Sequence, residues 1–188
     1  EYFFVDLLFI LVLNNEKMQK SIALLYGSDM GATEDVAATI YEKMNIEELS
    51  VIDVYNIKPS RFLDYDILIL GVPTWYIGEL QSAWDDFFPK FQKIKFEGIK
   101  VGFFGLGDQY GYPDNFVDGI GILAEVVIKN GGEIFGYWNN KGYDFNSSRG
   151  LAPNNTFYGL VIDEDNQYDQ TEPRIEKWIK QIKKELEI

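Results

Sequence analysis

Short apolar runs alternate with amphipathic stretches through most of this chain of 188 residues. The runs show little polar alternation, which is typical of strands that are buried on both faces of a parallel sheet. They lie at residues 21–26, 51–57, 66–72, 100–106, 133–138 and 156–163. Strands that alternate with helices predict an α/β fold, in which helices pack on both faces of a parallel sheet.

The stretches between the runs have helical periodicity. Residues 36–44 carry one apolar stripe, and residues 81–91 place large aromatic side chains at helical spacing. Residues 58–65 form a short turn or helix, and Asp114 is a candidate cap for the next helix. Residues 171–186 repeat the amphipathic pattern as a last helix. Side chains on such periodic stripes are expected in the core and not at a ligand.

The chain carries a net charge of −13 and contains neither cysteine nor histidine. Its acidity argues against binding to nucleic acid, which needs cationic contacts to phosphates, and favours basic partners. The absence of cysteine excludes disulfides, thiol catalysis and iron–sulfur clusters. Histidine is the commonest general base and transition-metal ligand, so its absence disfavours most hydrolase and zinc mechanisms.

The first 19 residues stand apart from the rest of the chain. Residues 3–13 are apolar except for Asp6, a run that is too short to span a bilayer and lacks the basic region of a signal peptide. Met18 resembles the first residue of an ordinary protein. Residues 1–19 are therefore a non-native or remnant extension, an added strand or helix, or a membrane anchor, and residues 20–188 form one domain.

Three loops that follow predicted strands contain residues suited to a ligand. The first opens a helix, and it consists of Ser28, Asp29, Met30, Gly31, Ala32 and Thr33. Free backbone N–H groups and hydroxyls at a helix start suit one phosphate, although a plain turn has the same residue types. The sequence has neither the lysine of a triphosphate loop nor the third glycine of a dinucleotide loop.

The second and third loops offer aromatic and polar side chains. The second comprises Pro73, Thr74, Trp75, Tyr76, Ile77 and Gly78, in which Trp75 is either a stacking surface or a core residue. The third runs from Leu106 and Gly107 through Asp108 and Tyr112 to Asn115, and a simple turn is its alternative. In a sheet of order 2-1-3-4-5 all three loops surround one switch point, so together they indicate a planar mononucleotide.

At these residues the chain resembles the long-chain flavodoxins, over about residues 19–188. The resemblance is carried by the segments at residues 73–81, 107–116, 136–145 and 160–167, with a long loop at about residues 139–155. It implies a three-layer flavodoxin-like fold whose five-stranded parallel sheet has a fifth strand split by that loop. It also implies non-covalently bound FMN, which would carry the chemistry itself.

The resemblance assigns roles to individual residues. Residues 28–33 correspond to the phosphate loop, and Trp75 and Tyr112 to the aromatic pair around the flavin ring. Thr74 and Asp165 correspond to positions near the ribityl chain, and Asp108 and Asn115 to the pyrimidine side. The Tyr76–Ile77 peptide before Gly78 corresponds to the bond that turns over to accept a hydrogen bond from the reduced flavin. Met30, Ala32 and Tyr76 depart from the family pattern, which has Thr, Asn and commonly Asn there.

The implied function is low-potential one-electron transfer between proteins, as a ferredoxin substitute without substrate turnover of its own. The implied partners are basic redox proteins, such as a ferredoxin/flavodoxin NADP reductase or photosystem I. A monomer in the cytoplasm or plastid stroma, with no membrane insertion and no metal, is expected. The alternatives are an FMN-dependent NAD(P)H or quinone reductase, a receiver domain, and a fold that has lost FMN binding.

Overall fold

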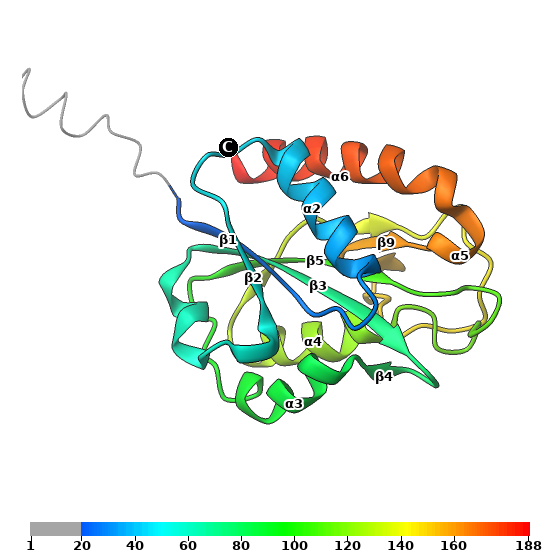
Figure 1. The fold of residues 1–188 in the computed structure, drawn as a ribbon, viewed down its shortest axis with the longest axis horizontal. Coiled ribbons are helices and arrows are strands. Elements are labelled where there is room, and N and C mark those ends of the chain that lie inside the picture. Colours follow the sequence, from blue (N-terminus) through cyan, green and yellow to red (C-terminus); the bar gives the residue numbers. More distant parts are fainter. Residues whose placement is uncertain (1–19) are drawn as a thin grey trace, which may run out of the picture.

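A computed structural model describes residues 20–188, and the N-terminal segment 1–19 lies outside the described residues. The predicted alternation of strands and helices is present along the chain (Figure 1). The strands are β1 (Ile22–Tyr26), β2 (Ser50–Asp53), β3 (Ile67–Trp75), β4 (Glu79–Leu80), β5 (Lys100–Leu106), β6 (Glu133–Ile134), β7 (Trp138–Asn139), β8 (Thr156–Phe157) and β9 (Leu160–Ile162). The α-helices are α2 (Ala32–Met44), α3 (Ser82–Phe91), α4 (Asp118–Lys129), α5 (Glu164–Gln167) and α6 (Thr171–Leu186).

The main sheet has the parallel order β2-β1-β3-β5-β6, and β9 also pairs with β5. Strand β6 pairs with the start of β5 at Lys100 and Val101, whereas β9 pairs with its end from Phe104 onward. Together β6 and β9 fill the fifth position of the sheet, one half each. The predicted split of the fifth strand and the predicted order 2-1-3-4-5 are therefore confirmed.

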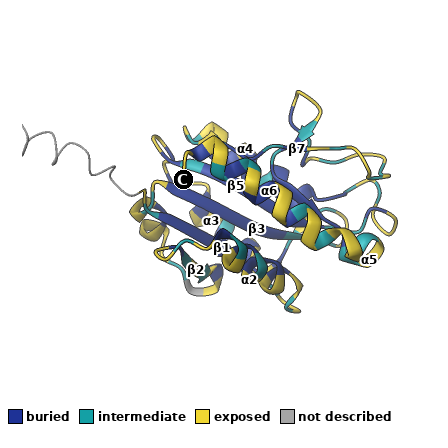
Figure 2. Ribbon diagram, turned by 90° about the horizontal axis from the view of Figure 1, so that it is seen from above, coloured by how far each residue is buried: buried dark blue, intermediate teal, exposed yellow. Residues whose placement is uncertain are grey.

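Helices cover both faces of the sheet, with α2 and α6 on one face and α3 and α4 on the other (Figure 1). The central strands are buried along most of their length, and the four long helices α2, α3, α4 and α6 each turn a buried stripe toward them (Figure 2). In α6 the predicted stripe is fully in the core; it consists of Ile175, Trp178, Ile179, Ile182 and Leu186. These two apolar layers hold the sheet rigid beneath its loops.

Four local predictions were wrong, and one of them is the run 156–163, which is not one strand but β8 and β9 with Tyr158 and Gly159 between them. The second strand ends at Asp53 and not at residue 57, because the Asp53 carboxylate accepts a hydrogen bond from Tyr55 N and starts a 3₁₀ turn. Asp114 does not cap α4, whose N-cap is Val117 with φ 51° and no side-chain cap. The run 133–138 is not one strand, since β6 ends at Ile134 and the chain turns away before β7.

The carboxyl ends of β1, β3 and β5 lie at one edge of the sheet, where the three candidate loops emerge (Figure 1). Strand β3 is longer than predicted and continues through Pro73 to Trp75, where it pairs antiparallel with the short β4. The chain therefore turns back directly after Trp75. In the part of the chain that the structure describes, no helix combines the length and apolarity needed to cross a membrane.

Candidate ligand-binding site

The loops that follow β1, β3 and β5, together with α5, enclose a cleft of about 270 Å³ at this edge. It is lined by Ser28, Asp29, Met30, Ala32, Thr33, Pro73, Thr74, Trp75, Leu106, Gly107, Asp108, Tyr112, Glu164 and Asp165. Thirteen of these fourteen residues are predicted site residues, and Glu164 is the addition. The predicted residues outside this lining are Gly31, Tyr76, Ile77, Gly78 and Asn115.

The loop before α2 is shaped to present backbone donors to the cleft. Gly31 has φ +92° and open space where a side chain would stand, and its N–H donates to Ser28 Oγ at 3.0 Å. The first N–H groups of α2 have no acceptor within the helix. Thr33 is 2% exposed and lines the cleft, and its hydroxyl has no hydrogen-bond partner within the described residues. This donor set fits a single phosphate group.

Asp29 is fixed by the neighbouring helix. Its Oδ1 accepts hydrogen bonds from Gln81 Nε2 at 2.7 Å and from Ser82 Oγ at 2.6 Å. Burial raises the pKa of the Asp29 carboxyl, but these hydrogen bonds outweigh that effect and hold the pKa below its usual value. The carboxylate is therefore charged at neutral pH and is held against α3.

Two aromatic side chains also line the cleft, in addition to the donors at the start of α2. Trp75 comes from β3, and Tyr112, which is 47% exposed, comes from the loop after β5. In residues 20–188 their rings do not contact each other; Trp75 meets the edge of Tyr76 at 5.7 Å between centroids. Two aromatic side chains that line one cleft without contacting each other are suited to stacking on a flat heterocycle bound there.

The turn after Trp75 is exposed and has unusual backbone angles. Tyr76 has φ 44° and Gly78 has φ 83°, while Tyr76 and Ile77 are 63% and 78% exposed. A Cβ on Gly78 would lie 2.6 Å from Asp118 Oδ2 and 2.9 Å from Asn115 Nδ2. The Asn115 amide is directed to Asp118, so in this structure it supports the turn and does not line the cleft.

The acidic rim of the cleft divides into carboxylates with and without hydrogen bonds. Asp108 accepts from Gly111 N at 2.7 Å and from Asn166 Nδ2 at 2.8 Å. Burial raises the pKa of Asp108, but these hydrogen bonds outweigh burial and lower it. For Asp165, burial and the nearby charges of Asp108 and Asp163 all raise the pKa. The lining contains four acidic residues and no lysine or arginine, so the cleft has a negative potential.

Sequence reasoning missed several residues that complete the site. Glu164 lines the cleft, and Gln81 and Asn166 hold Asp29 and Asp108 in place. Glu164 stands beside the predicted Asp165 in an acidic run directly after a strand, which is a usable signal. The roles of Gln81 and Asn166 depend on contacts 52 and 58 residues away, for which a single sequence has no signal.

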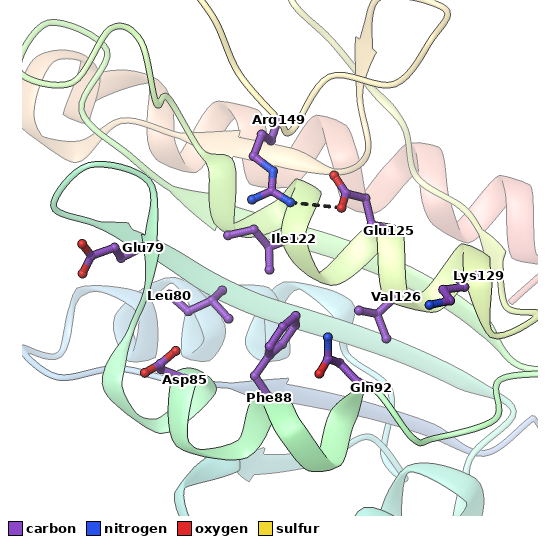
Figure 3. A pocket seen from close by; sticks show the side chains of 10 residues that line it. All are labelled: Glu79, Leu80, Asp85, Phe88, Gln92, Ile122, Glu125, Val126, Lys129 and Arg149. Atoms are coloured by element: carbon purple, nitrogen blue, oxygen red, sulfur yellow. Dashed lines mark hydrogen bonds and ion pairs between the residues drawn. The ribbon is translucent and has the colours of Figure 1, made fainter.

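A second cleft, of about 590 Å³, lies between α3 and α4 (Figure 3). Apolar side chains such as Leu80, Phe88 and Ile122 point into it, and an ion pair of 3.0 Å joins Arg149 to Glu125 at its border. The lining of this second cleft has neither serine or threonine hydroxyls nor a pair of aromatic side chains, and it carries charged side chains of both signs. The first cleft is therefore the better candidate. No group of three or more acidic residues within residues 20–188 is arranged for a metal ion.

The sequence model of the flavodoxin family matches residues 24–178. A flavodoxin of Nostoc sp. is 46% identical over 169 residues, which cover 90% of this chain and 99% of the relative. Flavodoxin 1 of Escherichia coli is 43% identical over 165 residues, which cover 88% of this chain and 94% of the relative. Both matches extend over nearly the whole described domain.

Among solved structures, that of a Fusobacterium nucleatum flavodoxin superposes with a TM-score of 0.83. It is 32% identical in sequence, and the match covers 89% of this chain and 99% of that one. That protein is bound to flavin mononucleotide. An oxidised flavodoxin from Bacillus cereus, 23% identical with a TM-score of 0.69, shares the fold.

Proposed function

The chain belongs to the flavodoxin family, and from this membership we propose that it is a low-potential one-electron carrier with non-covalently bound FMN. The observation that carries the proposal is the cleft at the carboxyl edge of the sheet. It combines a phosphate-sized set of donors, two aromatic side chains and an acidic lining. FMN supplies the one-electron chemistry when it is bound, and the protein supplies position and electrostatics.

Residues 28–33 would hold the phosphate, with Thr33 and the first N–H groups of α2 as donors. Trp75 and Tyr112 would enclose the flavin ring. Thr74 lines the cleft and accepts from Gly119 N at 3.0 Å, which leaves its own O–H for the ribityl chain. Asp108 and Asp165 lie on the rim, where they would meet the polar edge of the ligand.

The acidic lining is the protein's contribution to a low reduction potential. Asp29, Asp108, Glu164 and Asp165 line the cleft without a neutralising cation. Adding electrons to a ligand in such a site is opposed by like charge, through the same physics that shifts a pKa. These carboxylates would therefore lower the reduction potential of a flavin held in the cleft, as a ferredoxin substitute requires.

The described residues that line the cleft include no histidine, cysteine or lysine, and Asp165 is the one lining carboxyl whose pKa is raised. The ionisable side chains of the cleft are carboxylates and one tyrosine, Tyr112, and the carboxyls of Asp29 and Asp108 have lowered pKa values. We therefore propose transfer of electrons without substrate turnover. An FMN-dependent quinone or NAD(P)H reductase has no observation in its favour.

Partner proteins would dock around the exposed tip formed by Tyr76 and Ile77. Glu79 follows this tip and pairs with Trp75, and Asp85 lies with Glu79 at one end of the groove in Figure 3; neither acid forms an ion pair within the described residues. Asp86 on the same helix is also exposed and unpaired within the described residues. Basic faces of a reductase or of photosystem I suit such a surface, and binding through exposed charges is weak and sensitive to salt.

Other features of the proposal concern the chain as a whole. We propose that residues 20–188 act as one FMN-binding domain and as a monomer, in the cytoplasm or a plastid stroma. The relatives named above come from Nostoc and Escherichia coli. Residues 1–19 have no assigned role.

The visible absorption spectrum of the purified protein tests the proposal. We expect two flavin bands, full loading with FMN at one per chain, and photoreduction in two separate one-electron steps. A colourless protein that takes up no added FMN would contradict the proposal. A single two-electron step coupled to NAD(P)H oxidation would favour the reductase alternative.

A further inference from the structure

Gln81 is a buried polar residue that joins the two halves of the cleft without lining it. It is 1% exposed. Its backbone directly follows β4, which pairs with Trp75 and therefore carries one aromatic wall of the cleft. Its side chain caps α3, because Oε1 accepts a hydrogen bond from Trp84 N at 3.2 Å. Gln81 is thus fixed to the ring-binding side of the site.

The other end of the same amide reaches the phosphate-binding side. Nε2 of Gln81 donates to Asp29 Oδ1 at 2.7 Å, across 52 residues of sequence. Ser82 Oγ donates to the same oxygen at 2.6 Å. Asp29 lies in the loop that is expected to surround the phosphate. One carboxylate oxygen of this loop is therefore held by two donors from the start of α3.

The packing around Gln81 leaves this connection little freedom. A Cβ on Gly27 would lie 2.2 Å from Gln81 Oε1 and 2.7 Å from Trp84 Cδ1, so the glycine makes room for both side chains. The carbonyl of Gly71 accepts from Gly27 N at 3.2 Å and from Trp84 Nε1 at 2.8 Å. The end of β1, strand β3 and helix α3 are thus packed against one another at this point.

We propose that Gln81 is a positioning residue that couples the phosphate-binding loop to the Trp75 wall, so that binding at either half strengthens binding at the other. This inference rests on the proposed function. A phosphate that orders residues 28–33 fixes Asp29, which holds Gln81 and with it the β3–β4 turn behind Trp75. Because coupling between two sites is reciprocal, a ring bound at Trp75 favours the ordered loop equally.

The test separates the two halves of the ligand. The full-length protein is freed of FMN and titrated with riboflavin, which lacks the phosphate, in the absence and presence of saturating inorganic phosphate. In the unmodified protein we expect phosphate to tighten riboflavin binding about tenfold, within the usual range of coupling between sites. In Gln81→Met, which keeps the side-chain volume and loses both polar atoms, we expect less than about a twofold effect.

A second variant and a matched control keep the test independent of folding. Asp29→Ala removes the acceptor from the exposed end of the contact, outside the core, and should abolish the coupling as Gln81→Met does. Gln109→Met makes the same change at another buried glutamine, whose amide bonds to Asp163 Oδ2 at 2.6 Å. It should change riboflavin affinity equally with and without phosphate, so the coupling stays intact.

The outcomes distinguish this inference from the proposed function. Loss of coupling in Gln81→Met and Asp29→Ala, but not in Gln109→Met, supports it. Coupling that persists in Gln81→Met or Asp29→Ala, or an unmodified protein in which phosphate leaves riboflavin affinity unchanged, overturns it while FMN binding stands. An unmodified protein that binds neither FMN nor riboflavin overturns the proposed function, and this inference with it.

Discussion

The side-chain amide of Asn115 donates to Oδ2 of Asp118 at 3.0 Å, and these two atoms occupy the space beside Gly78 where a side chain would stand. Asp118 is 3% exposed, and its Oδ1 accepts from Arg149 N at 2.7 Å. The pair is therefore held in place from the long loop. Glycine is required at position 78 for two reasons: the backbone has a positive φ, and Asp118 and Asn115 leave no space for a side chain.

Gly78→Ala should destabilise the protein and alter its redox behaviour. The left-handed backbone alone costs a non-glycine residue about 1–2 kcal/mol, and the close contacts with Asp118 and Asn115 add to this. Gly78 follows the Tyr76–Ile77 peptide. We therefore expect the substitution to cost more free energy in the one-electron-reduced state, seen as a shift of the first potential, than in the binding of oxidised FMN. Urea unfolding and spectroelectrochemical titration measure the two effects.

Gly98→Ala is the matched control for this substitution. Gly98 also has φ +83°, but nothing lies within 4 Å of the position of a Cβ. It should lose about 1–2 kcal/mol of stability from the backbone alone and leave both potentials unchanged. Equal stability losses in the two variants, with potentials unchanged in both, would leave Gly78 a structural residue only.

Met30→Thr should strengthen FMN binding. Met30 is 85% exposed and lines the cleft, at a position where the family pattern has a threonine. One added hydroxyl donor to the phosphate is worth about 1 kcal/mol, or about fivefold in the dissociation constant. Fluorescence titration of the FMN-free protein measures the change. Riboflavin affinity should not move, and an equal gain for riboflavin would show that the hydroxyl does not act on the phosphate.

The fold could be predicted from the sequence because the patterns that indicate its strands and helices are local. Apolar runs and helical stripes fixed the order and type of the main elements, and the buried stripe of α6 lies where it was predicted. A predicted strand boundary was wrong where a side chain hydrogen-bonds to the backbone close by in the sequence. Val54 is fully buried and continues the apolar run of β2, yet the Asp53 carboxylate turns the chain there.

The candidate site could likewise be predicted in part from the sequence. Loops that follow parallel strands meet at one edge, so it was predictable from topology that the three candidate loops would line one cleft. The hydrogen-bond donors to Asp29 and Asp108 were not predictable, because Gln81 and Asn166 come close to these carboxylates only in the folded chain. The role of Asn115 at the ligand stays a prediction, and the structure adds a contact that the sequence did not indicate, from its side-chain amide to Asp118.

Asp165→Asn should stabilise the FMN-free protein at neutral pH. Burial and the charges of Asp108 and Asp163 raise the pKa of Asp165 above 3.8, so the folded state binds a proton more readily than the unfolded state. The charged carboxylate therefore opposes folding fully above the folded pKa, and this cost disappears below the unfolded pKa.

The gain from Asp165→Asn should consequently be complete near pH 7, shrink as the pH falls through the folded pKa, and vanish below about pH 3.8. Urea unfolding of both proteins across this range measures it. Asp169→Asn, on the exposed 3₁₀ turn that follows α5, is the control and should bring no comparable gain. A gain that is constant down to pH 3 would refute the electrostatic explanation.

Raising the ionic strength should slow electron transfer to a basic partner at fixed driving force. Exposed charges near the Tyr76–Ile77 tip steer encounter, and steering of this kind contributes at least about tenfold to association at low salt. Of the acids in residues 105–128, Asp118 is buried and Glu125 is paired with Arg149. Asp108 and Asp114 keep their charge but accept hydrogen bonds from Asn166 and Asn146. We therefore assign the steering mainly to the exposed Glu79, Asp85 and Asp86.

A pair of double variants tests this assignment. Asp85→Asn with Asp86→Asn removes two exposed charges from α3, and it should lower the association rate and flatten its dependence on salt. Glu47→Gln with Glu48→Gln removes two charges from the exposed turn between α2 and β2, at the opposite edge of the sheet, and should leave both nearly unchanged. Stopped-flow kinetics over a range of salt concentrations provides the comparison. If both double variants change the rate equally, only net charge matters and the proposed docking face is wrong.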